Sequence, residues 1–246
     1  MSVLRIDHLS RSFGSLIVTN DVSLSIENGE RHVIIGPNGA GKTSLINQIG
    51  GQLRPSAGCI LFGDIDITGW SPHQISRMGV ARTFQRNNLF QNLSVIENLR
   101  LAVQARFGNP LNFFTPVSQL RNLLERADEL MKRVHLDRGM RLVRELSYGE
   151  QRQLEIGIAL AAEPKLLLLD EPTSGMSPAE TSRMIDLIAK LPRSLAILMI
   201  EHDMTVVFSV SDRITVLYYG EVLATGTPAE IQINDRVREV YLGITH

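Results

Sequence analysis

The sequence has little cysteine and no excess of charge, which excludes internal disulfides and weakens a nucleic-acid-binding function. Only one of its 246 residues is cysteine, Cys59, so no internal disulfide can form, and we expect a small core residue in a reducing compartment. The formal net charge of -1 gives no sign of a nucleic-acid footprint, so no nucleic-acid partner is expected. The 43% of hydrophobic residues suffice for a sizeable core.

Long apolar runs are also missing. Stretches such as Leu195 to Ile200 are far shorter than the ~20 residues of a membrane-spanning helix. The segment Met1 to Asp7 has no charged-then-apolar pattern of a leader. We therefore expect a soluble, unexported, cytoplasmic chain, in which any membrane role passes through a partner.

The most informative segment present is a glycine-rich loop between a predicted strand, Arg31 to Ile35, and a predicted helix, Lys42 to Ile49. It fits the phosphate-binding pattern of two glycines with four residues between them followed by Lys-Thr. The candidate nucleotide-binding residues are Gly36, Pro37, Asn38, Gly39, Ala40, Gly41, Lys42, Thr43 and Ser44. Glycines let successive N–H groups point inward, and the helix N-terminus adds positive potential. A nucleotide is predicted, with Lys42 at its β- and γ-phosphates and Thr43 on Mg²⁺.

Carboxylates and a histidine follow two further buried strands. Leu166 to Leu169 is an apolar run too short for a helix, and it leads into Asp170 and Glu171. Ligands of α/β sheets lie at such strand ends. Asp170 suits a Mg²⁺-bound water and Glu171 suits activation of an attacking water. His202 follows the predicted strand at 196–201 in a parallel position.

Three further candidates are ambiguous from their residue types alone. Phe13 lies in a predicted loop between the strands at 3–7 and 22–26, where it either stacks on a purine or packs on the sheet. Gln85 is either functional or an ordinary loop glutamine. Ser147 and Gly149 open a predicted helix and form either a second anion site or an ordinary capped helix.

The middle of the chain is predicted to be helical. Helical periodicity extends over 94–106 and 117–135, and no strand pattern appears between Asn87 and Ala162. This block is best interpreted as an inserted helical subdomain. Its apolar loop, Leu111 to Pro116, is a candidate contact for another protein.

Taken in order, these motifs resemble the ATP-binding subunits of ABC transporters along essentially the whole chain. The resemblance makes 36–43 the Walker A loop, 146–151 with Gln151 the signature, and 166–170 the Walker B strand. It also makes Gln85 the Q-loop glutamine, a metal ligand beside Thr43 and Asp170. It implies catalytic roles for Glu171, the catalytic glutamate, for His202, the switch histidine, and for Lys42.

Two residues depart from the usual family pattern. Tyr148 stands in the signature where glycine is most common, and Ser177 stands after the Walker B strand where aspartate is usual. Both variants resemble the branch that serves importers of branched-chain amino acids and of amides or urea. Ser177 puts in doubt any contact across a dimer that needs a carboxylate.

The resemblance implies a single α/β domain, 1–246. Its P-loop NTPase (RecA-like) core, with an N-terminal antiparallel β subdomain, covers 1–86 and 162–246, and the helical signature subdomain covers 87–161. The implied function is Mg²⁺-dependent ATP hydrolysis that powers uptake of branched-chain or other hydrophobic amino acids. Alternatives are urea or short-chain amide import, a soluble ABC ATPase of translation or DNA repair, and a nucleotide-binding module without turnover.

The implied partners lie at the inner face of the cell membrane. They are a second ATP-binding subunit, identical or related, integral membrane permeases and, indirectly, a solute-binding protein. In this arrangement ATP held by residues 36–43 of one copy is covered by Ser147 and Gly149 of the other, and closure reaches the permease through 85–92 and the helical subdomain.

Overall fold

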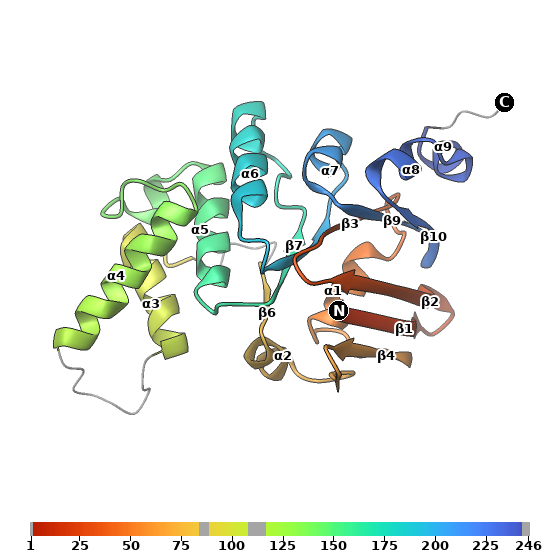
Figure 1. Cartoon of the computed structure of the whole chain (residues 1–246), viewed down its shortest axis with the longest axis horizontal. Coiled ribbons are helices and arrows are strands. Elements are labelled where there is room, and N and C mark those ends of the chain that lie inside the picture. Colours follow the sequence, from red (N-terminus) through yellow and green to blue (C-terminus); the bar gives the residue numbers. More distant parts are fainter. Residues whose placement is uncertain (1, 84–88, 108–116, 243–246) are drawn as a thin grey trace. The chain divides into compact units, whose positions relative to one another are not determined.

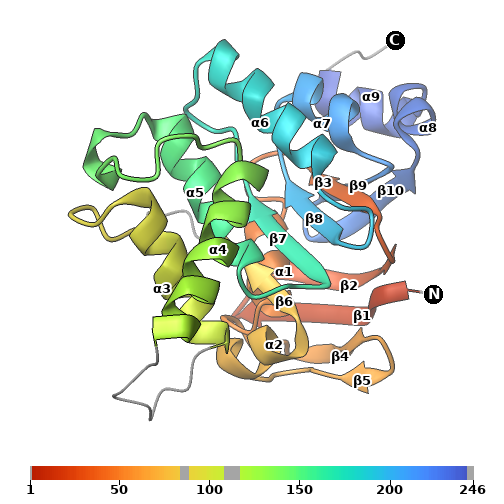
Figure 2. The ribbon, with the colours of Figure 1, turned by 60° about the vertical axis from the view of Figure 1, so that its left-hand side comes forward.

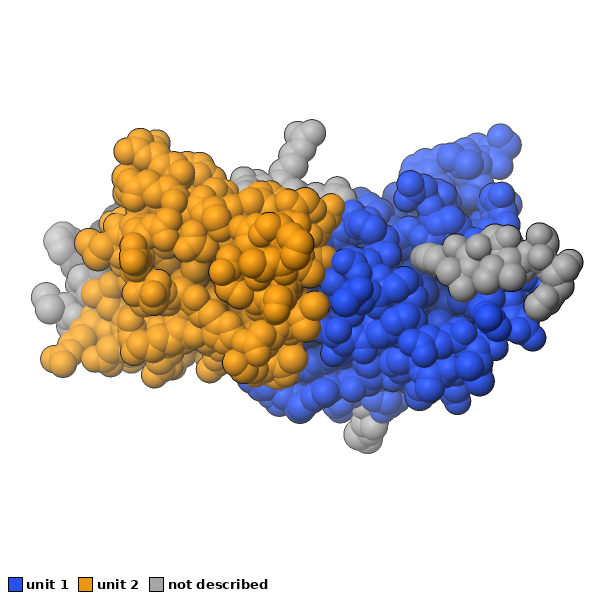
Figure 3. Space-filling view, turned by 90° about the horizontal axis from the view of Figure 1, so that it is seen from above, with its two compact units in different colours: residues 1–80, 165–171, 192–246 blue, residues 81–164, 172–191 orange. Residues whose placement is uncertain are grey.

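The computed structural model describes residues 2–83, 89–107 and 117–242. Its chain divides into two compact units, which are coloured separately in Figure 3. Unit 1 comprises residues 1–80, 165–171 and 192–246, and unit 2 comprises 81–164 and 172–191. Residues 172–191, which the sequence analysis assigned to the core, thus group with the helical unit.

A mostly parallel sheet has the strand order β10-β9-β3-β8-β7-β6, and all of it except Ala81 and Arg82 of β6 belongs to unit 1. The strands are β3 (Arg31–Ile35), β6 (Val80–Arg82), β7 (Leu166–Asp170), β8 (Ala196–Ile200), β9 (Arg213–Tyr218) and β10 (Glu221–Gly226). Strand β3 pairs in parallel with β8 and β9, β7 pairs in parallel with β8, and every residue of β3, β7 and β8 is buried. The loops after these strands therefore meet at one edge of the sheet.

Strand β3 has the predicted bounds, and its first two residues are buried although both are polar. Arg31 and His32 are only 2% and 1% exposed, and both are held by polar partners. The Arg31 guanidinium donates to the Leu195 carbonyl at 2.7 Å, whereas the His32 ring contacts Glu30 and Thr215, each at 2.7 Å. Because both polar side chains have hydrogen-bond partners, the strand tolerates their burial.

An antiparallel sheet packs in the same hydrophobic core, as the sequence predicted. Its order is β2-β1-β4-β5, with β1 (Ser2–Phe13), β2 (Leu16–Glu27), β4 (Ala57–Phe62) and β5 (Ile65–Asp66). Leu4 and Ile60 of this sheet join Leu168 and Leu198 of the parallel sheet in one buried cluster. The strands are longer than predicted, and Phe13 is the last residue of β1, paired with Leu16, rather than a loop residue.

Short helices complete unit 1 (Figure 1). They are α1 (Lys42–Ile49), α2 (Pro72–Met78), α7 (Met204–Val210), α8 (Pro228–Gln232) and α9 (Asp235–Leu242). Helix α1 has the predicted bounds and buries Leu45, Ile46 and Ile49. Helix α8 begins with a capping box, in which Thr227 and Glu230 satisfy each other's backbone N–H groups.

Unit 2 consists mainly of helices (Figure 2). Its elements are α3 (Val95–Phe107), α4 (Val117–Arg133), the short 3₁₀ helix η1 (Val143–Glu145), α5 (Tyr148–Leu160) and α6 (Pro178–Lys190). Gly157 of α5 lets Leu99 and Val134 approach closely, because a Cβ at this position would lie 3.0 Å from the Leu99 side chain. None of the helices in the described part of the chain combines the length and the hydrophobicity of a transmembrane segment.

Candidate active site

The phosphate loop connects the buried end of β3 to the start of α1 within unit 1. Gly39 and Gly41 have φ angles of +81° and +96°, which residues other than glycine rarely adopt. A Cβ at Gly41 would also lie 2.1 Å from the Val18 carbonyl oxygen, so this position has no room for one. The Ala40 N–H donates back to the Pro37 carbonyl at 3.2 Å and closes the turn. Local sequence and packing therefore both impose the curled backbone.

The first amide groups of α1 suit an anion. The Leu45 N–H donates to the Gly41 carbonyl at 2.9 Å, so the N–H groups of Lys42, Thr43 and Ser44 precede this bond of the helical ladder. Such groups combine with the helix dipole to favour phosphate. Thr43 is exposed and Lys42 is buried at this helix start. The backbone of this loop and helix start therefore suits the predicted phosphate site.

The Lys42 side chain lies across this loop. Its Nζ donates to the Gly36 carbonyl at 2.7 Å and to the Pro37 carbonyl at 3.0 Å. Burial lowers the pKa of Lys42, and the negative charges of Glu171 and Asp170 oppose this shift. The ammonium group is therefore placed to exchange two carbonyl partners for phosphate oxygens.

Two carboxylate residues lie at the carboxyl end of β7, at the same edge of the sheet as the phosphate loop. Asp170 is the last residue of the strand, and Glu171 follows it. Asp170 is 4% exposed, and Glu171 has a left-handed φ of +48°. Its N–H donates to the Ile200 carbonyl at 3.0 Å, which ties the turn to β8. A non-glycine residue in this backbone region is strained, and such strain is concentrated at functional sites.

His202 follows β8 and approaches this pair. Its Nδ1 lies 3.7 Å from Glu171 Oε1, and the two side chains are 58% and 32% exposed. This distance is too long for a hydrogen bond but allows an ion pair when the ring is protonated. The parallel sheet thus brings Lys42, Asp170, Glu171 and His202 to one edge, as their positions after three strands suggested.

The chemistry of these residues suits a divalent cation bound together with phosphate. Within the described part of the chain, no cluster of three or more His, Cys, Asp or Glu residues is placed to hold a metal ion. Mg²⁺ in phosphate sites needs only one or two protein oxygens, because the substrate supplies others. The Thr43 hydroxyl and the Asp170 carboxylate fit this requirement.

Of the two remaining predicted residues, Phe13 and Gln85, the structure describes only Phe13. Phe13 is 50% exposed, and the Arg11 guanidinium lies over its ring at 4.5 Å from the centroid. Base stacking by Phe13 stays a prediction. Gln85 lies outside the described residues, as does the loop from Leu111 to Pro116.

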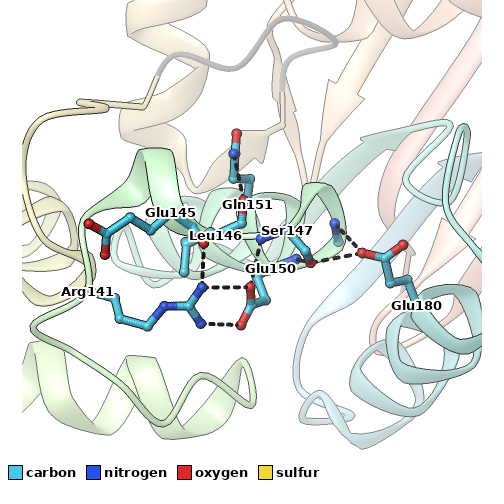
Figure 4. Close-up of polar contacts among 8 residues, drawn as sticks. Arg141, Glu145, Leu146, Ser147, Glu150, Gln151 and Glu180 are labelled. Carbon is cyan, nitrogen blue, oxygen red and sulfur yellow. Dashed lines mark hydrogen bonds and ion pairs between the residues drawn. The ribbon is translucent and has the colours of Figure 1, made fainter.

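The second predicted anion site is in unit 2, at the start of α5. Ser147 is the N-cap, and it forms a capping box with Glu150, which Arg141 holds at 2.9 Å (Figure 4). The Gln151 side chain donates to the Leu146 carbonyl at 3.2 Å. Ser147 Oγ and the Gly149 N–H both contact Oε1 of Glu180, at 2.8 and 3.1 Å. The structure therefore adds Glu180 to this site.

Glu180 is not among the residues predicted for this site, because it belongs to another helix. Ser177 and Glu180 form a capping box at the start of α6, and this local pattern is visible in the sequence. Nothing in the pattern says that the same carboxylate also reaches Ser147, 33 positions away. The contact between Glu180 and Ser147 depends on how the two helices pack, which no local sequence pattern indicates.

The two departures from the family pattern both have local partners in unit 2. The Tyr148 hydroxyl accepts hydrogen bonds from Arg152 at 2.8 and 3.1 Å, and Arg152 also forms an ion pair with Glu155 at 2.8 Å. Ser177 caps α6, where its hydroxyl donates to Glu180 at 2.7 Å. Tyr148 thus positions the Arg152 side chain on α5, whereas Ser177 caps the start of α6.

Comparison with known proteins decides the family. Residues 19–174 match the family model described as ABC transporter. The chain belongs to the ABC transporter family. Residues 221–246 of this cassette match a second model, described as branched-chain amino acid ATP-binding cassette transporter. The resemblance stated from the motifs is confirmed.

Similar proteins match the cassette over its length. The high-affinity branched-chain amino acid transport ATP-binding protein LivG of Escherichia coli is 41% identical, over 98% of each chain. BraF of Pseudomonas aeruginosa, which carries the same description, is 40% identical over 98% of each chain. Among solved structures, the ADP conformation of MJ1267, an ATP-binding cassette of an ABC transporter, has a TM-score of 0.87 at 31% identity, covering 99% of this chain and 100% of the other. These likenesses confirm the predicted fold class.

Proposed function

We propose that this cassette is the ATP-binding and ATP-hydrolysing subunit of an importer of branched-chain amino acids. The observation that carries the proposal is similarity along the whole chain to transport ATP-binding proteins of that description, joined to the match of residues 221–246. The proposed location is the cytoplasmic face of the cell membrane, where the cassette acts through permease partners. A solute-binding protein then participates only indirectly.

In this function, the residues at the edge of the parallel sheet carry the chemistry. The loop amides and Lys42 bind the β- and γ-phosphates of ATP, which concentrates positive charge where negative charge develops. Bound Mg²⁺, held by Thr43, Asp170 and Gln85, would neutralise phosphate charge. Glu171 orients the attacking water and accepts its proton. His202, beside Glu171, positions the γ-phosphate.

A second ATP-binding subunit completes each proposed site. Ser147 and Gly149 of one copy donate to the γ-phosphate bound by residues 36–43 of the other, so that ATP stabilises a closed dimer. Hydrolysis removes the shared phosphate and favours reopening. The helical unit transmits this change to the permease.

The first test is capture of partners. A tagged chain would be purified from detergent-solubilised native membranes, and the co-purifying proteins would be identified by mass. We expect multi-span permeases. Recovery of ribosomes or nucleic-acid proteins would contradict the importer and favour a soluble ABC ATPase.

Cargo needs a separate measurement. The captured complex would be reconstituted in vesicles with its solute-binding protein, and ATP hydrolysis would be measured with leucine, isoleucine, valine, urea or acetamide. We expect stimulation by the three amino acids. Stimulation by urea or acetamide alone would replace the proposed cargo.

A further inference from the structure

One carboxylate, that of Glu180, divides its two oxygens between two helix starts in unit 2. Oε2 completes the capping box of α6, accepting the Ser177 N–H at 3.1 Å and the Ser177 hydroxyl at 2.7 Å. Oε1 crosses to α5, where it accepts the Ser147 hydroxyl at 2.8 Å and the Gly149 N–H at 3.1 Å. Figure 4 shows this carboxylate facing Ser147. The contact thus joins the start of α6 to the signature.

The surroundings of Glu180 favour its charged form. Hydrogen bonds from the side chain and backbone of Ser177, followed by those from Ser147 and Gly149, lower its pKa from 4.5 to about 2. At neutral pH the group is therefore an anion. Four donors converge on it, as they would on a phosphate oxygen.

The residues around the carboxylate are suited to this contact. A Cβ on Gly149 would lie 2.8 Å from Glu180 Oε1, so a larger residue would push the carboxylate away. Ser177 supplies a hydroxyl donor at a position where an aspartate would add a second negative charge. The departure from the family pattern at Ser177 therefore strengthens the hold on Glu180.

The two donors cannot serve two anions at once. The Ser147 hydroxyl and the Gly149 N–H have one hydrogen each, and both are directed to Glu180 in the structure. A γ-phosphate using the same hydrogens would also be repelled by a carboxylate in contact with it.

We propose that Glu180 is an internal competitor of ATP for the signature. Before closure it occupies the donors of Ser147 and Gly149, and it releases them when the γ-phosphate bound by a second copy enters. This rests on the proposed role of the signature in the closed dimer. The contact raises the ATP concentration at which two copies close, and it limits closure when ATP is scarce.

The test is Glu180→Gln in the hydrolysis-deficient Glu171→Gln chain. Glutamine at this helix position retains the capping box through its carbonyl oxygen. Its NH₂ group cannot accept a hydrogen bond, so the donors of Ser147 and Gly149 are freed. The matched control is Glu230→Gln, which makes the same change in the capping box of α8, where Glu230 accepts the Thr227 N–H at 2.7 Å.

The measurement is light scattering of each full-length protein against ATP concentration. We expect the midpoint for dimer formation in Glu180→Gln to be lower than in the Glu230→Gln control by about threefold or more. A merely structural role for Glu180 would not lower the midpoint. An unchanged or higher midpoint in a folded Glu180→Gln protein overturns the competitor, while an ATP-dependent dimer of the parent leaves the proposed function intact. Absence of any dimer in the Glu171→Gln parent overturns both.

A second measurement tests the contact without requiring the dimer. Amide hydrogen exchange of Gly149 would be followed in the monomer of Glu180→Gln and of Glu230→Gln. We expect faster exchange at Gly149 in the first variant only, because its acceptor has been removed. Equal protection in both variants contradicts the contact, and a misfolded variant would show loss of protection throughout its core.

Discussion

At the scale of the residue, the backbone of Glu171 is as informative as its carboxylate. A left-handed φ of +48° directly after a buried strand is sterically unfavourable, and the N–H bond to Ile200 holds it in place. The neighbouring Asp170 keeps the ordinary conformation of β7. The turn thereby separates the roles proposed for two adjacent carboxylates, a metal ligand and a water-orienting group.

For Glu171→Gln we expect ATP binding to be retained and turnover to fall by ~10²-fold or more, because an amide cannot accept the proton of the attacking water. Steady-state phosphate release and nucleotide binding would be measured together. The control is Glu163→Gln, since Glu163 also has a positive φ, of +50°, but lies in unit 2. Undiminished hydrolysis in Glu171→Gln would show that another residue activates the water.

Lys42 should affect both binding and rate. Lys42→Ala removes the cation beside Asp170 and Glu171 and leaves the Gly36 and Pro37 carbonyls without its two hydrogen bonds, of 2.7 and 3.0 Å. We expect weaker binding of a fluorescent ATP analogue as well as loss of hydrolysis. Lys190→Ala, which removes an exposed lysine paired with Asp186 on α6, is the control. Normal ATP affinity in Lys42→Ala would contradict the assignment of the phosphate loop.

At the scale of the element, sequence patterns predicted the loops, helices and caps that depend only on residues close together in the chain. The phosphate loop, α1 and the start of α5 follow from glycine spacing, periodicity and capping residues, and all appear in the structure. The burial of Arg31 and His32 does not follow from the local sequence, because the Leu195 carbonyl and the Thr215 hydroxyl that they contact come from distant segments. Glu180 was missed for the same reason: its capping box is local, but its contact with Ser147 is not.

The start of α6 should make stability depend on pH. The pKa of Glu180 is lowered to about 2 in the folded chain, from 4.5, so its stabilising contribution is complete above about pH 4.5 and is lost as the pH falls toward 2. We therefore expect the free energy of unfolding to decrease less steeply between pH 6 and 3 in Glu180→Gln than in the natural chain. Denaturant titrations at successive pH values measure this slope.

Glu230→Gln provides a graded comparison for this slope. The pKa of Glu230 is also lowered, by hydrogen bonds from the backbone and side chain of Thr227, and among the described residues no second helix donates to it. Its replacement should remove a smaller part of the acid dependence. An equal effect of the two substitutions would mean that Ser147 and Gly149 contribute nothing to the ionisation of Glu180.

At the scale of the whole molecule, the candidate residues are divided between the two units. Unit 1 holds Lys42, Asp170, Glu171 and His202, whereas unit 2 holds Ser147 and Gly149. The buried cluster that joins the two sheets lies in unit 1, whereas unit 2 is built mainly from helices. Under the proposed function the two groups meet across two copies of the cassette, so catalysis depends on association rather than on one chain.

Ser147→Arg tests this dependence. In the Glu171→Gln chain, we expect the added guanidinium to leave ATP binding by residues 36–43 unchanged but to abolish the ATP-dependent dimer, because a long side chain replaces the small donor at the signature. Ser25→Arg places the same charge on an exposed residue of β2 and should dimerise normally. Ser147 also caps α5, so circular dichroism at the assay temperature would establish that the variant is folded. Light scattering that still reports a dimer in a folded, ATP-bound Ser147→Arg protein would rule out closure of the signature over the nucleotide of a second copy.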